Sequence, residues 1–216
     1  QRTQQRKKEL LKKTKKMYME LNIIGATGLV GKEIIKLLEK IELKKIENIN
    51  FIASKNSKGV NIKFKNIDYQ IEMLENINFN KQNITINCSS SEIAKDIFQK
   101  NYDNTNMYFI DNSSALRMLE TVPLVVPHIN FPENYNNFFA NPNCSTIILS
   151  CLLKPLIDYK IERIIISSYQ AASGAGKEGL DELYLQMNQL INNKVLTTDF
   201  WKKQYIGNCF VHNSEL

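Results

Sequence analysis

The 216-residue chain has few of the side chains that usually hold metals. It contains two histidines and four cysteines, Cys88, Cys144, Cys151 and Cys209, with no Cys-x-x-Cys pair. This spacing does not form a zinc-binding motif, so we expect no metal site. Free thiols are typical of a reducing compartment, which favours the cytoplasm.

The chain also lacks a long apolar run. No window of about 18 apolar residues occurs, so no membrane span is predicted, and no secretory signal is recognised. The apolar fraction of 43% is still sufficient for a packed core. The length allows one large domain or two small ones.

An excess of positive charge is confined to the first 20 residues. They carry eight basic and two acidic side chains, which account for the whole net charge of +6. The remaining chain is neutral and lacks the electrostatic footprint of a nucleic-acid-binding surface. We interpret the basic tail, residues 1–18, as a disordered or partly helical extension or as non-native sequence before Met19. A targeting or nucleic-acid-binding arm is the alternative.

Glycine is scarce, yet three of the eight glycines fall in one short segment. An apolar run, Leu21–Ile24, precedes Gly25-Ala26-Thr27-Gly28-Leu29-Val30-Gly31, and Lys32–Lys40 has helical periodicity. A strand, a glycine turn and a helix are typical of the start of a dinucleotide-binding βαβ unit. An ordinary glycine turn is the alternative.

The segment after the next expected strand, Ile49–Ala53, concerns the choice of cofactor. An acidic residue at this position usually binds the ribose of NAD. Here the chain has Ser54-Lys55-Asn56-Ser57-Lys58. Hydroxyls and lysines favour the 2′-phosphate of NADP, although a surface loop is the alternative.

Two more expected strands, Asn83–Cys88 and Met107–Ile110, end in small polar residues. Such strand ends line the ligand crevice of an open α/β sheet. We also expect a helix over Glu92–Lys100 and a small hairpin over Lys63–Ile71. The predicted fold class is α/β, with a Rossmann-type dinucleotide-binding domain over residues 19–143.

Cys144 is positioned as a nucleophile. The turn Asn141-Pro142-Asn143-Cys144-Ser145-Thr146 directly precedes an apolar helical run, so the helix would begin at the thiol. A helix N-terminus stabilises negative charge, and the thiolate is the reactive form of cysteine. A buried, inert Cys144 is the alternative, and Cys151 is expected in the core.

A second glycine-rich segment follows an expected strand over Arg163–Ser168. It could bring Gln170 and a phosphate or nicotinamide to the same sulfur. The helix expected over Lys177–Asn192 has an apolar stripe that we interpret as core or subunit contact: Leu180, Leu183, Tyr184, Met187 and Leu190. We predict a partial α+β catalytic and dimerisation domain over residues 144–216.

Five segments, in order, resemble motifs of the aspartate-semialdehyde dehydrogenase family. They are Gly25–Gly31, Phe109–Met118, Val122–Pro127, Asn141–Thr146 and Ser168–Gly176. The resemblance runs from about Met19 to about His212. It implies a cytoplasmic oxidoreductase of lysine, threonine, methionine and diaminopimelate biosynthesis, which is a homodimer or homotetramer when complete.

The resemblance implies NADPH-dependent reductive dephosphorylation of β-aspartyl phosphate to aspartate semialdehyde. Cys144 attacks the acyl carbon, phosphate leaves, and hydride reduces the resulting thioester. A sibling acyl-phosphate reductase, such as N-acetylglutamyl-phosphate reductase, and a noncatalytic nucleotide-binding protein are the alternatives.

The resemblance also implies roles for single residues. Gln170 would orient the substrate, Asn143 would help to hold the oxyanion, and Arg117 would bind the phosphate. The implied cofactor contacts are Gly25, Thr27, Gly28, Leu29, Val30 and Gly31 at the pyrophosphate, Ser54, Asn56 and Ser57 at the adenosine phosphate, and Ser173 and Gly174 at the nicotinamide. A family arginine is missing at Asn56, so Lys55 or Lys58 is expected to replace it.

Members of the family extend well beyond the position of Leu216. The additional part holds their acid/base histidine and the arginine that binds the substrate carboxylate. General acid–base help typically contributes a rate factor of about 10²–10⁴. We therefore expect the 216-residue chain to be nearly inactive and to expose apolar surface.

Overall fold

The computed structural model describes residues 18–57, 59–134 and 136–210. The predictions for residues 1–17 of the basic tail and for Lys58 lie outside these residues. Contacts within the chain divide it into two compact units, residues 1–164 and residues 165–216, and each is described by itself. The catalytic-domain boundary near Cys144 stays a prediction.

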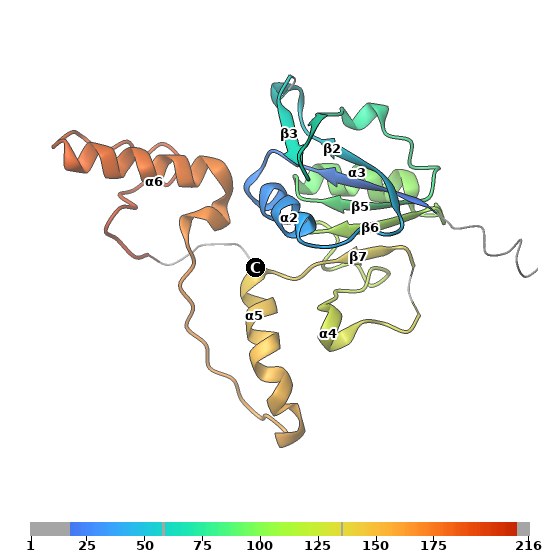
Figure 1. Ribbon diagram of the computed structural model, residues 1–216. Coiled ribbons are helices and arrows are strands. Elements are labelled where there is room, and N and C mark those ends of the chain that lie inside the picture. The colour runs from blue at the N-terminus through green and yellow to red at the C-terminus, as the bar shows by residue number, and fades with distance from the viewer. Residues whose placement is uncertain (1–17, 58, 135, 211–216) are drawn as a thin grey trace, which may run out of the picture. The chain divides into compact units, whose positions relative to one another are not determined.

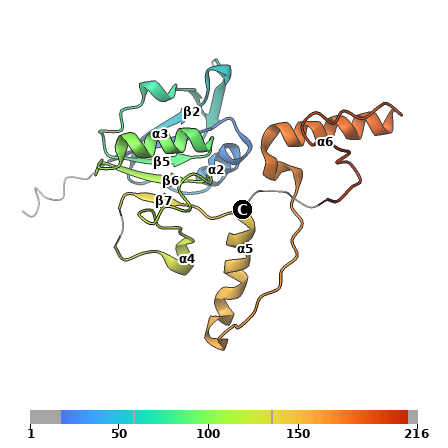
Figure 2. The same ribbon diagram turned by 180° about the vertical axis from the view of Figure 1, so that it is seen from behind.

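Unit 1 is built on a five-stranded parallel sheet with the order β2-β1-β5-β6-β7 (Figure 1). The strands are β1 (Met19–Ile24), β2 (Ile46–Ile52), β5 (Asn83–Asn87), β6 (Met107–Asp111) and β7 (Phe138–Ala140). Helix α2 (Leu29–Glu39) covers one face and α3 (Ser91–Asn101) the other (Figures 1 and 2). The prediction of an α/β, Rossmann-type domain is confirmed.

Alternating side chains of the strands supply two apolar clusters, one on each face of the sheet. Ile23 of β1 packs with Ile35 of α2, whereas the next residue, Ile24, packs with Ala94 and Ile97 of α3. Successive strand residues point to opposite faces. Because helices cover both faces, apolar side chains pack on both sides of the sheet.

The strand order reverses between β1 and β5. From β1 the chain crosses through α2 to β2 on one side, and it later returns to β5 on the other side. The loops that follow β1 and β5 therefore diverge. In open α/β sheets, ligands bind at the carboxyl ends of the strands at such a switch point.

A hairpin and a short helix lie between β2 and β5. Strands β3 (Asn61–Phe64) and β4 (Ile67–Gln70) are antiparallel, and both residues of their turn have positive φ, 47° and 65°. This is the conformation of a two-residue type I′ turn. The predicted hairpin is thus confirmed, and it is followed by the 3-10 helix η2 (Leu74–Asn76).

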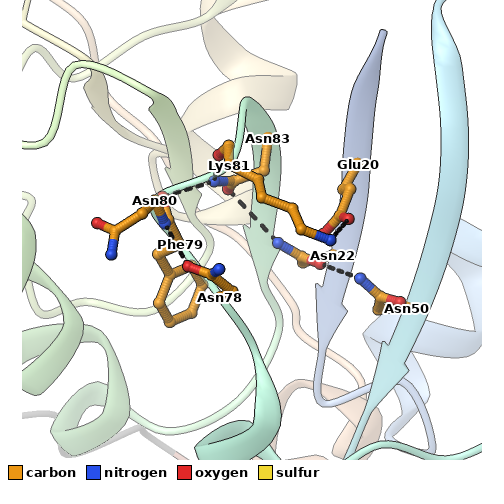
Figure 3. Close-up of polar contacts among 8 residues, drawn as sticks. All are labelled: Glu20, Asn22, Asn50, Asn78, Phe79, Asn80, Lys81 and Asn83. Carbon is orange, nitrogen blue, oxygen red and sulfur yellow. Dashed lines mark hydrogen bonds and ion pairs between the residues drawn. The ribbon is translucent and has the colours of Figure 1, made fainter.

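Polar side chains bridge three strands of the sheet on the α3 side (Figure 3). Asn50 Nδ2 of β2 donates to Asn22 Oδ1 of β1 over 2.8 Å. Asn22 Nδ2 donates to Thr85 Oγ1 over 3.0 Å and to Asn83 Oδ1 over 3.4 Å, both on β5. We call these four residues the polar ladder. The buried Asn22 thus finds partners on both neighbouring strands, and Thr85 Oγ1 also donates to Asn83 Oδ1 over 2.8 Å. These bonds avoid the cost of an unsatisfied polar group.

Two elements near the end of unit 1 were not predicted. They are α4 (Pro127–Asn130) and the three-residue strand β7. After β7 come α5 (Cys144–Leu153) and the 3-10 helix η3 (Lys154–Tyr159). None of the residues of α5 is buried, so the prediction that Cys151 lies in the core is wrong. The reason is that α5 extends away from the sheet (Figure 1), and its main contacts are with η3, which follows it directly in the chain.

The strand predicted over Arg163–Ser168 is also wrong. These residues form no regular element, and Ile164, Ile165 and Ile166 are 48%, 88% and 55% exposed. Isoleucine favours strands, but a strand needs a neighbour for its backbone hydrogen bonds. No segment within the described residues pairs with this one.

Unit 2 consists of the 3-10 helix η4 (Ala172–Ala175), the helix α6 (Gly176–Ile191) and the segment that follows. The buried residues of α6 are Gly179, Glu182 and Gln186. Gln186 Nε2 donates to the carbonyl of Thr197 over 2.7 Å, and Glu182 carboxylate oxygens accept from the amides of Phe200 and Trp201. The helix therefore holds the segment by its polar face.

This packing bears on the apolar stripe predicted along the same helix. Tyr184, Met187 and Leu190 are 59%, 40% and 50% exposed. They are not core residues of unit 2, because the segment at 197–206 is held by the other face. A subunit contact through this stripe stays a prediction.

Candidate active site

The glycine turn after β1 forms a cradle that has no room for side chains. Gly25 has φ +81°, and a Cβ added there would meet the carbonyl oxygen of Cys88 at 2.7 Å. A Cβ on Gly31 would meet the carbonyl oxygen of Gly25 at 2.3 Å. Glycine at these two positions therefore allows the tight turn and the close packing of the start of α2 against it.

Helix α2 begins directly after this turn. Its N-cap is Gly28, whose amide donates to the carbonyl of Gly25 over 2.9 Å, and no side chain caps the first turn of α2. Uncapped amides and the positive end of the helix dipole favour an anion such as a pyrophosphate. The residues present thus fit a dinucleotide, with Thr27, Leu29 and Val30 in the same turn.

The loop after β2 lies beside the glycine turn. Thr27 Oγ1 and Ser57 Oγ are 3.2 Å apart, and the carbonyl of Ile52 accepts from the amides of Gly25 and Ala26. The 3-10 helix η1 (Lys55–Ser57) belongs to this loop. Ser54 and Asn56, which precede Ser57 in the loop, are exposed. These predicted cofactor residues therefore gather at the carboxyl ends of β1 and β2.

Hydrogen bonds connect the loops that follow β5, β6 and β7. The amide of Asn112 donates to the carbonyl of Asn87 over 3.0 Å, and the amide of Asn141 donates to that of Asp111 over 2.8 Å. Asn141 Nδ2 also donates to Asn112 Oδ1 over 2.6 Å. The turn that contains Cys144 is therefore fixed to the same sheet edge as the glycine turn, three strand spacings or about 14 Å along the sheet.

Cys144 is the first residue of α5, as the sequence predicts, and it is exposed rather than buried. Asn143 is the N-cap, and its Oδ1 accepts from the amide of Ser145 over 3.0 Å. The same oxygen lies 3.8 Å from Cys144 Sγ. The cap bond to Oδ1 fixes the orientation of the amide group, whose Nδ2 is the side-chain donor that Asn143 can offer to a substrate.

Arg117 is half-buried and braces two of the loops at this edge. Its Nε donates to the carbonyl of Asn141 over 2.9 Å, and one terminal nitrogen donates to the carbonyl of Asn112 over 3.0 Å. These bonds use two of the five donors of a guanidinium group. The role of Asn112 as the shared partner of Arg117 and Asn141 was not predicted, although the sequence places it in a polar strand end.

A second thiol lies at the same edge in a different environment. Cys88 follows β5, and burial raises its pKa to about 11. A hydrogen bond from Asn112 Nδ2 to Cys88 Sγ, 3.7 Å long, opposes this effect, and the charge of Asp111 adds to it. Cys88 is therefore a neutral thiol near pH 7, which argues against it as the nucleophile.

The remaining predicted site residues belong to unit 2. Gln170 and Ser173 are exposed, and Ser173 and Gly174 lie within η4, directly before α6. A Cβ added to Gly174 would be 4.0 Å from Gln170 Oε1. Unit 2 thus brings these three residues together, and unit 1 brings together the others.

Other kinds of site find no support in the described part of the chain. It contains no group of three or more histidine, cysteine, aspartate or glutamate side chains that could hold a metal. None of its helices combines the length and the hydropathy needed to span a membrane.

Comparison with known proteins agrees with this geometry. Residues 20–137 match the family model "Semialdehyde dehydrogenase, NAD binding domain", and residues 153–216 match "Semialdehyde dehydrogenase, dimerisation domain". The chain belongs to the aspartate-semialdehyde dehydrogenase family. This family membership was predicted from the motifs and is confirmed.

Individual relatives show how much of the family the chain spans. It is 38% identical over 199 residues to the aspartate-semialdehyde dehydrogenase of Rickettsia conorii. The aligned region covers 90% of this chain and 58% of that protein. Aspartate semialdehyde dehydrogenase II from Vibrio cholerae has a TM-score of 0.83 and 31% identity, covering 92% of this chain and 60% of that one. A structure of the Vibrio cholerae enzyme complexed with ASA also gives a TM-score of 0.83.

Proposed function

We propose that this chain supplies the dinucleotide site and the nucleophile of an NADP-dependent aspartate-semialdehyde dehydrogenase. The reaction is the reductive dephosphorylation of β-aspartyl phosphate to aspartate semialdehyde. The observation that supports it best is an exposed Cys144 at the start of α5, on the sheet edge that also carries the glycine turn. The chain covers only 58–60% of the length of the relatives compared above, so the activity of the complete enzyme is itself part of this proposal.

In this proposal Cys144 acts as the nucleophile. Its sulfur forms a bond to the acyl carbon, and the bond from that carbon to the phosphate oxygen breaks, which releases inorganic phosphate. The N-terminal end of α5 stabilises the thiolate before attack. Asn143 Nδ2 donates to the carbonyl oxygen as negative charge develops on it.

Arg117 binds the phosphate of the substrate in this scheme. Its planar guanidinium suits a phosphate, and the two backbone bonds hold its orientation near the Cys144 turn. Gln170 orients the substrate. Ser173 and Gly174 approach the nicotinamide, in line with the implied roles of the second glycine-rich segment.

The dinucleotide is held by the glycine turn and the loop after β2. The amides at the start of α2 would hold the pyrophosphate, and Ser54, Asn56 and Ser57 would contact the adenosine half. NADPH held there would supply the hydride for reduction of the thioester carbonyl. The carbon–sulfur bond would then break, which releases the semialdehyde and restores the Cys144 thiolate. We further propose a cytoplasmic enzyme that assembles as a homodimer or homotetramer.

The acyl-transfer half of the reaction can be tested without turnover. The purified chain is mixed with β-aspartyl phosphate and analysed by intact mass and peptide mapping. We expect one aspartyl group on Cys144 and about one equivalent of released phosphate per chain. Because only this half is required, the test does not depend on the residues that act later.

Two controls make this test specific. Cys144→Ser should form no adduct that hydroxylamine removes, and N-acetyl-γ-glutamyl phosphate should label the wild-type chain much more slowly. An adduct on another cysteine, or equal labelling by both acyl phosphates, would contradict the proposal.

A further inference from the structure

The loop after β2 lacks an acidic residue in sequence, but the fold brings one to it. The amide of Glu72 donates to the carbonyl of Phe51 over 2.8 Å, and the amide of Ala53 donates to the carbonyl of Glu72 over 3.3 Å. These bonds attach the segment before η2 to the carboxyl end of β2. The residues of η2, Leu74–Asn76, therefore follow directly beside the adenosine loop.

Glu75 of η2 faces a lysine of that loop. Its Oε1 lies 4.0 Å from Lys55 Nζ, and the two side chains are 63% and 84% exposed. Two residues after Lys55, Ser57 contacts Thr27 of the glycine turn. Lys55 is thus a cation on the loop expected to meet the adenosine phosphate, and Glu75 is its counter-charge.

This pairing affects the two kinds of dinucleotide differently. A phosphate monoester carries a charge of about −1.5 to −2 near pH 7. A carboxylate beside Lys55 competes for the ammonium group and repels such a phosphate. The 2′-hydroxyl of the unphosphorylated dinucleotide carries no charge, and acidic side chains bind it in other dinucleotide sites.

We propose that Glu75 is a specificity-determining residue, which opposes Lys55 and so reduces the preference of the site for the 2′-phosphorylated dinucleotide. The inference rests on the proposed cofactor site. It concerns the ratio of two affinities, so it is separate from the question of which acyl phosphate is reduced.

The test is equilibrium binding of NADPH and NADH to the full 216-residue chain, followed by the fluorescence of the reduced nicotinamide. Glu75→Gln should tighten NADPH binding about threefold, the size expected for one exposed charge, and leave NADH binding unchanged. Lys55→Gln should weaken NADPH binding and again leave NADH unchanged. In the double variant the effect of Glu75→Gln should shrink, because the lysine it opposes is gone.

A matched control separates a local effect from a change of net charge. Glu42 is also an exposed carboxylate paired with a lysine, Lys44, at 3.2 Å, and it precedes the opposite end of β2. Glu42→Gln should leave the ratio of the two affinities at its wild-type value. Raised salt should reduce the difference between Glu75→Gln and wild type, since exposed charges are screened.

The outcomes distinguish this inference from the proposed function. If the wild-type chain binds both dinucleotides but Glu75→Gln changes neither, or changes both equally, the inference is overturned and the cofactor site stands. If the folded wild-type chain binds neither, the proposed cofactor site is wrong and the inference falls with it. A ratio shifted equally by Glu42→Gln would also overturn it.

Discussion

Two thiols at the carboxyl edge of one sheet show how position decides chemistry. Cys88 is largely enclosed after β5, and burial raises its pKa to about 11. Cys144 is exposed at the first residue of a ten-residue helix. The same functional group is therefore inert at one strand end and accessible at the other.

Alkylation rates should follow these positions. Cys144 and Cys151 are both exposed on α5, but Cys144 begins the helix and Cys151 lies in its last turn. Because the helix dipole stabilises a thiolate at the N-terminus and disfavours it near the C-terminus, iodoacetamide at pH 7.5 should label Cys144 about fivefold faster. Peptide mapping over time measures both rates in one sample.

The pH dependence of labelling provides a further check. The raised pKa keeps Cys88 protonated below about pH 11, so its labelling should stay slow near neutrality and increase as the pH rises toward that value. Cys144→Ser should abolish the fast phase of iodoacetamide labelling, because we expect that phase to come from Cys144 and not from Cys209. Equal rates at Cys144 and Cys151 would argue against activation by the helix terminus.

At the scale of helices and strands, local sequence patterns were sufficient to predict most elements of unit 1. The glycine turn, α2 and the polar ends of β5 and β6 were predictable because each depends on neighbours in sequence. The strand β7 has three residues and gains its place by pairing with β6, which no local pattern reports. The isoleucines at 164–166 show the reverse case, since a strand-like composition found no partner strand.

The polar ladder should respond sharply to a single substitution. Asn22→Ala would remove the acceptor of Asn50 Nδ2 and the Asn22 amide that donates to Thr85 and Asn83, which keep the bond from Thr85 Oγ1 to Asn83 Oδ1. The expected loss in the free energy of unfolding is about 2–3 kcal/mol, because unsatisfied buried groups keep their desolvation penalty. Urea unfolding followed by far-UV circular dichroism measures it.

The matched control is Asn48→Ala. Asn48 is on the same sheet, two residues before Asn50 in β2, but is exposed. Its replacement should change the free energy of unfolding by no more than about 0.5 kcal/mol. A similar loss for both variants would mean that the hydrogen bonds of the ladder contribute little.

At the scale of the whole molecule, the chain consists of two units with different kinds of interior. Unit 1 has apolar clusters on both faces of a sheet. In unit 2, Glu182 and Gln186 of α6 hold the 197–206 segment by hydrogen bonds, and Trp201 packs against Tyr205 with ring centroids 4.1 Å apart. The units should therefore respond separately to substitutions.

Gln186→Ala tests this separation. Gln186 is fully buried and bonds to backbone groups of Thr197, Lys203, Tyr205 and Ile206. Its loss should destabilise unit 2 by about 2–3 kcal/mol, while the slow alkylation of the enclosed Cys88 thiol, which reports on unit 1, stays close to wild type. Trp201, the single tryptophan, reports on unit 2 by its fluorescence.

Asn188→Ala is the control for the change in α6. Asn188 is exposed and lies two residues further along the same helix, so the tryptophan transition should hardly move. Faster alkylation of Cys88 in Gln186→Ala than in wild type would show that the stabilities of the two units are coupled.

The sequence predicts which residues form the candidate site, but not all of the contacts that hold them. Motifs identify Asn143, Cys144 and the glycines, because each occupies a helix start or a turn that depends only on its neighbours in sequence. The bracing of Arg117 by Asn112 and Asn141, and the arrival of Glu75 beside Lys55, depend on strand order and on a hairpin that returns the chain to β2. Such contacts between distant segments leave no spacing pattern in the sequence.

The four members of the polar ladder also constrain how this protein can evolve. Asn22, Asn50, Asn83 and Thr85 satisfy one another, so the effect of replacing one depends on what occupies the other three. An aliphatic residue introduced alone at position 22 would be harmful, because Asn50 would lose its acceptor and Asn83 would lose one of its donors. In related proteins we therefore expect the residues at these four positions to change together. Moving a single residue from one such protein into another that differs at the other three positions should destabilise it.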